Sequence, residues 1–249
     1  MKRRIRITTS VLSMLAVAGI IVLSACKELP EQDEQAMENN VSFEEMGRLH
    51  NELLSNYYDH RVQRMSTLDA KISELMDMSW KHLEDAGYSK MQIGNARRVL
   101  PEIPGKSSLK GILEDGFSLD TTNLADLFSE NDNLSGELIA DISDLVLKAY
   151  SGEDVDKLTN YVNDEFAMKS YTGVEDEIAQ GIFVDIFNSS FTYWEEFYSS
   201  KKSNLKLKDS SKVIINDAIG GVIGTIFGPI GSVLTAAVFS VGTNEELKD

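Results

Sequence analysis

The sequence predicts an all-α protein, a multi-helix bundle that ends in a glycine-rich apolar helical hairpin. Apolar residues recur at spacings of three and four along most of the chain, and no stretch sustains the period-two alternation of a strand. The 4 prolines fall outside the interiors of the predicted helices, where a proline would break the backbone ladder. Because hydrophobic residues make up 42% of the 249 residues, the chain can bury a sizeable core.

The predicted helices are marked by their ends as well as by their apolar spacing. Ser42 followed by Glu45 has the pattern of a capping box, which indicates a helix start. Gly87, Gly152 and Gly173 each follow an apolar stripe, and glycine suits the residue that closes a helix. The predicted helices cover 43–54, 65–83, 89–100, 134–149, 155–168, 174–200, 212–227 and 230–241, with one or two short helices expected among the loops of 101–133.

The first 25 residues have the pattern of a signal peptide rather than of the mature protein. A positive start is followed by the uncharged and mostly apolar stretch Val11–Leu23. The basic residues of this start are Lys2, Arg3, Arg4 and Arg6. The apolar stretch is too short and too close to the N-terminus to make a good membrane-spanning helix.

The tetrapeptide Leu23-Ser24-Ala25-Cys26 ends this segment and closely resembles the lipobox of bacterial lipoproteins. The resemblance implies that a signal peptidase recognises the first three residues and cuts before Cys26, which then carries lipid, including fatty acyl chains such as palmitate. Two or more acyl chains give stable anchoring, because each buried methylene contributes about 0.8 kcal/mol. Lys27 stands where inner-membrane lipoproteins carry aspartate, so the resemblance implies the outer membrane, on its periplasmic or surface face. The alternative is an uncleaved signal anchor with an incidental cysteine.

Charge and cysteine content limit what the mature chain can do. The formal net charge is −16, and it becomes −20 without the basic residues of the first 25. Such a chain repels nucleic acid and anionic headgroups, so no nucleic-acid partner is expected.

The acidic, polar stretch 26–41 predicts a flexible tether, and 42–249 predicts a single helical domain. With 1 cysteine in the chain, intramolecular disulfides are excluded.

A glycine-rich apolar segment follows Asp217. Gly220, Gly224 and Gly228 are four residues apart and Gly231 adds to them, which makes a ridge that another helix can approach closely. The Gly228-Pro229 pair divides the segment into two pieces, each short for a membrane span. This favours an apolar hairpin buried in the bundle. Because the whole run is long enough to span a bilayer, membrane insertion is one alternative, and an exposed partner-binding surface is another.

The search for chemistry yields few candidates. His50 with Asn51 is the most suggestive pair, because the histidine could act as a base or ligand while the asparagine orients it. The simpler interpretation is a helix histidine hydrogen-bonded to a neighbouring helix. Asp217, the one charge bordering the apolar run, is interpreted as a helix cap or a partner of Lys212; the alternative is a buried acid with a raised pKa, which would mark a site.

No catalytic residue, metal site or cofactor is predicted. The 3 histidines lack the spacing of two ligands on one helix face, and neither His-Glu-x-x-His nor Glu-x-x-His occurs.

Three landmarks of the mature chain resemble those of lipoproteins and secreted proteins of unassigned function from gut and environmental bacteria. They are Gly-x-x-His-Asn-x-x-Leu, Ser-x-x-Tyr-Trp, and Asp-x-x-Gly followed by a glycine zipper and Gly-Pro-x-Gly. In this chain they fall at Gly47, His50, Asn51 and Leu54; at Ser190, Tyr193 and Trp194; and at Asp217, Gly220, Gly224, Gly228, Pro229 and Gly231. The resemblance implies a shared fold and brings no activity with it.

Three functional hypotheses follow from these features. The first is a non-enzymatic lipoprotein, held on a membrane by its N-terminal lipid and acting through a protein partner or self-association. The second is a membrane-active or oligomerising protein that uses the glycine zipper in segment 217–242. The third is an enzyme that uses His50 and nearby acids, which requires a bound metal or a cleft that holds His50 with other polar groups.

Overall fold

A computed structural model describes residues 43–61, 67–99, 128, 134–200 and 207–247, and these residues belong to one compact unit, Asn40–Asp249. Their regular secondary structure is entirely helical, which confirms the predicted all-α class. The predicted signal peptide and tether lie outside the described residues, as do the lipobox from Leu23 to Cys26, the capping residue Ser42, and 101–133 apart from Phe128.

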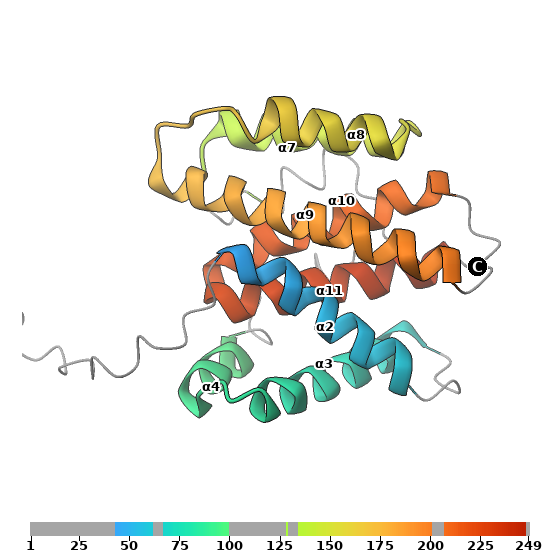
Figure 1. Cartoon of the computed structure of the whole chain (residues 1–249). Coiled ribbons are helices and arrows are strands. Elements are labelled where there is room, and N and C mark those ends of the chain that lie inside the picture. The colour runs from blue at the N-terminus through green and yellow to red at the C-terminus, as the bar shows by residue number, and fades with distance from the viewer. Residues whose placement is uncertain (1–42, 62–66, 100–127, 129–133, 201–206, 248–249) are drawn as a thin grey trace, which may run out of the picture. The chain divides into compact units, whose positions relative to one another are not determined.

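The helices form a bundle around two central C-terminal helices (Figure 1). The α-helices are α2 (Phe43–His60), α3 (Leu68–Asp85), α4 (Lys90–Val99), α7 (Gly136–Tyr150), α8 (Val155–Tyr161), α9 (Val174–Ser200), α10 (Leu207–Ile223) and α11 (Gly228–Glu246). A π-helical turn, η3 (Val162–Phe166), continues α8, and a 3-10 turn, η4 (Gly224–Phe227), joins α10 to α11. α9 and α7 pack on α10, whereas α2, α3 and α4 pack on α11.

One cap and two of the three predicted closing glycines lie at helix ends, whereas Gly173 directly precedes α9 and closes no helix. The Ser135 hydroxyl accepts a hydrogen bond from the Leu138 N–H at 3.2 Å and so satisfies a backbone group that the first turn of α7 leaves free. Gly87 and Gly152, which follow α3 and α7, have φ values of +87° and +84°. Because this left-handed region favours glycine, both residues end their helices for the predicted reason.

The chain after α8 departs from the prediction. A helix is predicted through Met168, but the α-helix ends at Tyr161 and widens into η3, where the Ala167 N–H donates to the Val162 carbonyl at 2.8 Å. Val162 and Phe166 stay buried, whereas Met168 is 76% exposed. The predicted place of Met168 on the buried stripe is therefore wrong, because the helix ends at Phe166 and Met168 lies in the turn that follows.

α10 and α11 form the predicted apolar hairpin. All side chains in 213–223 and 230–244 are buried. Gly228, with φ +78°, lies at the turn, and Pro229 follows it in the first turn of α11. The first arm differs in its bounds from the predicted 212–227, because α10 begins at Leu207 and its last turn tightens into η4. None of the described helices combines the length and apolar character that a bilayer span requires.

Two glycines of the ridge bring the hairpin arms into backbone contact. A Cβ added at Gly220 would lie 2.8 Å from the Thr235 carbonyl oxygen, and one at Gly224 would lie 2.5 Å from the Gly231 carbonyl oxygen. Real Cβ atoms do not approach backbone this closely, so α11 occupies the space that larger residues would need. The ridge is therefore used inside the chain, between α10 and α11.

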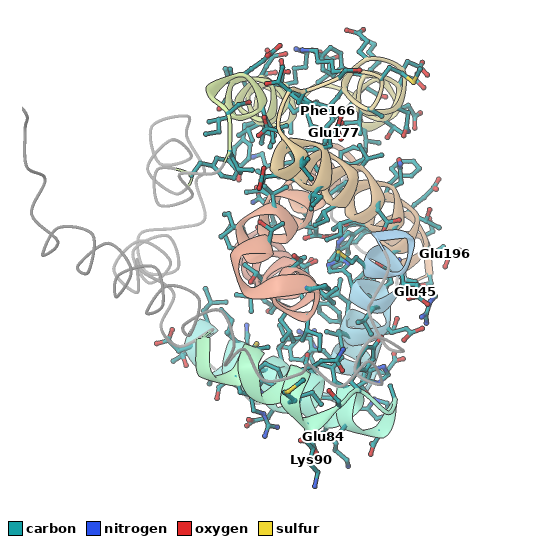
Figure 2. All side chains as sticks on the ribbon, turned by 90° about the vertical axis from the view of Figure 1, so that its left-hand side faces the viewer. Glu45, Glu84, Lys90, Phe166, Glu177 and Glu196 are labelled. Carbon is teal, nitrogen blue, oxygen red and sulfur yellow. The ribbon has the colours of Figure 1, made fainter. Side chains whose placement is uncertain are left out.

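Charged side chains line the outside of the bundle. Figure 2 shows Glu45, Glu84, Lys90 and Glu196 pointing away from the helices, and each is exposed. In contrast, the aromatic stripe of α9 points into the core, where Trp194 is fully buried and lies 5.7 Å from Tyr58 between ring centroids. This division explains how a strongly acidic chain builds an apolar interior.

Candidate functional site

The structure brings residues from all three sequence landmarks together in the core. His50 comes from α2, Ser190 and Trp194 from α9, and Asp217 from α10, and all four side chains are buried. Asp217 Oδ2 accepts a hydrogen bond from the Ser190 hydroxyl and another from the Trp194 indole N–H, the latter at 3.0 Å. We call these four residues with Asn51 the core polar cluster.

Asn51 fixes the ring of His50. Its amide nitrogen donates to the Ser189 carbonyl at 2.9 Å, which leaves its oxygen to face His50 Nδ1 at 3.1 Å. Because an amide oxygen only accepts, this network assigns the proton to Nδ1 in the neutral ring. His50 Nε2 is then the acceptor nitrogen, and it lies 3.7 Å from Asp217 Oδ2 with no hydrogen-bond partner within the described residues.

Burial controls the protonation of the pair. Loss of solvation lowers the pKa of His50 to about 4, although the bond to Asn51 favours the charged ring. Burial likewise raises the pKa of Asp217 to about 8, against hydrogen bonds from Ser190 and Trp194 that favour the carboxylate. The two groups therefore hold one proton between them over the range from about 4 to about 8.

A glycine allows α2 to lie close enough to α9 for this contact. A Cβ added at Gly47 would lie 2.7 Å from the Asp185 carbonyl oxygen, so only glycine leaves room at the crossing. The Gly47 N–H also donates to the Asp185 carboxylate at 2.6 Å. Leu54, the last residue of the same landmark, is fully buried. The first landmark is thus one face of α2, with packing residues at both ends and the polar pair between them.

The structure corrects the two simplest interpretations of Asp217. The residue lies in the interior of α10 and does not cap it. Lys212 does not pair with it, because Lys212 Nζ lies 5.4 Å from the centroid of the Tyr150 ring instead. The alternative, a buried acid with a raised pKa, agrees with the structure.

The Asn51 edge of the core polar cluster reaches a described surface hollow, whereas His50 and Asp217 do not. A hollow of about 580 Å³ between α2, α3 and α9 is lined by Asn51 and Ser189 but not by His50 or Asp217. A second, of about 330 Å³, lies beside η3 and is lined by Lys148 and Tyr161 among others. Within the described residues no group of three or more His, Cys, Asp or Glu could hold a metal ion. His50 and Asp217 can hold and exchange a proton, and neither side chain lines the two hollows described.

The sequence identifies three of the five residues of this cluster as candidates. Its pattern singles out His50, Asn51 and Asp217 without connecting them, whereas Ser190 and Trp194 stand only as parts of a landmark. Ser190 and Trp194 are four residues apart, and this spacing places the hydroxyl and the indole on one helix face. It is the one feature of the sequence that could have connected them. The predicted packing glycines also lie together, with Gly220 and Gly224 against α11, Gly231 facing Gly224, and Gly228 at the turn.

Comparisons with known proteins add no assignment: no family model, no curated protein and no solved structure matches this chain.

Proposed function

We propose that the protein is a lipoprotein of the bacterial cell envelope, anchored through lipid on Cys26, and that its helical body acts by contact with another protein. The observation that carries the proposal is the burial of the C-terminal hairpin. The segment that could have served as a second membrane device packs against α2, α3, α7 and α9. With that segment in the core, the lipobox cysteine remains the feature best suited to hold the chain on a membrane.

The described surface supports contact with a protein more than catalysis. His50 and Asp217 lie inside the bundle, and neither side chain lines a described hollow. Val174 and Ile178, by contrast, expose 66% and 36% of their surface in the first turns of α9. Exposed large apolar side chains favour protein contacts, because covering them removes apolar surface from water.

Intact mass of the protein from envelope fractions tests the anchor. The expected mass is that of residues 26–249 with two or three acyl chains, and protease treatment of whole cells should remove the body if it lies on the outer surface. A Cys26→Ala variant is the matched control and should carry no lipid. An unmodified full-length mass in the wild type would contradict the anchor.

Photocrosslinking in cells tests the contact. A photoreactive residue at Val174 should form a discrete adduct, whereas the same residue at the exposed Lys157 should not. Equal adducts from both positions, or none from Val174, would count against a contact at the start of α9.

A further inference from the structure

One buried pair of titratable side chains links α2 to α10. His50 and Asp217 are both fully buried, and His50 Nε2 lies 3.7 Å from Asp217 Oδ2. The charged neighbours of His50 on its own helix, Arg48 and Glu52, pair with each other on the exposed face of α2. They therefore do not compensate a charge in the core.

The elements packed around the pair supply no cation within the described residues. α9 brings Tyr193, whose partly buried phenol feels the charge of Asp217 and whose pKa is raised mainly by desolvation. α11 brings the buried Ser240, whose hydroxyl carries no charge. Lys212 of α10 lies over the ring of Tyr150. The net charge at this point of the core is consequently set by the number of protons on His50 and Asp217.

We propose that His50 and Asp217 form a proton-operated latch, which holds α2 on the α10–α11 hairpin while the pair carries one proton and releases α2 when that proton leaves. The one-proton pair is neutral overall, either as imidazole with carboxylic acid or as imidazolium with carboxylate. Without the proton, a single negative charge remains in an apolar interior, where burial strongly disfavours it.

Proton counting fixes the pH at which the latch responds. The latch requires that the open state admits water to both side chains, so that their pKa values return toward the ordinary 6.5 and 3.8. The closed state has values of about 4 and about 8. Between about 4 and 6.5 both states bind one proton, so opening does not depend on pH. Between 6.5 and about 8 only the closed state keeps its proton. The opening constant should therefore rise about tenfold for each pH unit in that window.

Release of α2 would change the surface of the body. Met46, Leu49 and Leu53 of α2 pack in one apolar cluster with Val233 and Leu234 of α11. An open α2 would uncover these hairpin side chains for contact with a partner. The inference thus goes beyond the proposed anchor, and its test does not depend on lipid.

Hydrogen exchange of the purified full-length chain tests the latch. Opening constants of α2 amides, corrected for the intrinsic exchange rate at each pH, should be flat from pH about 4.5 to 6.5 and then rise about thirtyfold by pH 8. The amides of α7 are the internal reference, because α7 packs on α10 and is not one of the main contacts of α2. If the opening constants of the α7 amides rise in step with those of α2, the pair governs the global stability of the chain and the latch is overturned.

Two isosteric variants give profiles that a structural role alone does not predict. Asp217→Asn should abolish the rise above pH 6.5, because it leaves no acid to ionise. His50→Gln should extend the rise down to pH about 4, because the open state then has no group that binds a proton between 4 and 6.5. The wild-type profile decides the matter if either variant fails to fold: no change between pH 6.5 and 8, or an unchanged rise in Asp217→Asn, overturns the proposal.

Discussion

Asp217 shows how much of a residue's behaviour depends on neighbours that lie far away in the sequence. Its place at the edge of an apolar run is visible in the sequence, and a raised pKa could be considered from that alone. The partners that set its state come from α2 and α9, and one sequence gives no sign of which helix faces pair. The site residues were therefore predictable as candidates, while their convergence was not.

Ser190→Ala tests the hydrogen bond that the hydroxyl donates to Asp217. Because this bond lowers the pKa of Asp217, its loss should raise that pKa further above its value of about 8. A carboxyl-carbon NMR titration measures the shift directly. Ser143→Ala is a matched control, since the Ser143 hydroxyl donates to the Ile139 carbonyl of its own helix. A downward shift in Ser190→Ala, or an equal shift in both variants, would count against the described cluster.

At the scale of elements, periodicity predicted most helices because burial of one face is a local property of the sequence. α9 has the predicted bounds, Val174–Ser200, and α7 carries its predicted stripe of Leu138 to Ala149. The π-turn η3 was missed because its wider hydrogen bond leaves no mark on apolar spacing until its last residue. Met168 is exposed because it lies in the turn beyond η3, where no helix continues the stripe.

Gly224→Ala tests the close approach of α10 and α11. The new Cβ would collide with the backbone of Gly231 and Ser232, which cannot move without separating the arms. We expect a loss of at least about 2 kcal/mol in the free energy of unfolding, within the range for overpacked cores.

Gly181→Ala is the matched control for this substitution. Nothing lies within 4 Å of a Cβ at Gly181 in α9, so alanine there should stabilise the helix by about 0.5–1 kcal/mol. Denaturant unfolding of both variants gives the comparison. If Gly224→Ala is as well tolerated as Gly181→Ala, the hairpin arms do not pack as described.

At the scale of the whole molecule, the two apolar parts of the chain differ in their proposed roles. The N-terminal segment resembles a signal peptide that ends at a lipidation site, and the C-terminal segment fills the core. Hydropathy alone favoured the buried hairpin without deciding between it and membrane insertion. What distinguishes the two is the contact of α10 and α11 with the other helices, which depends on tertiary packing.

Flotation on zwitterionic phospholipid vesicles at pH 6 tests the central claim that lipid on Cys26, and not the hairpin, holds the protein on a membrane. This pH is chosen because the proposed latch begins to open above pH 6.5. The processed wild-type protein should float with the vesicles, and the unlipidated body, residues 27–249, should stay at the bottom of the gradient. If the unlipidated body floats, the hairpin enters the bilayer and the account is contradicted.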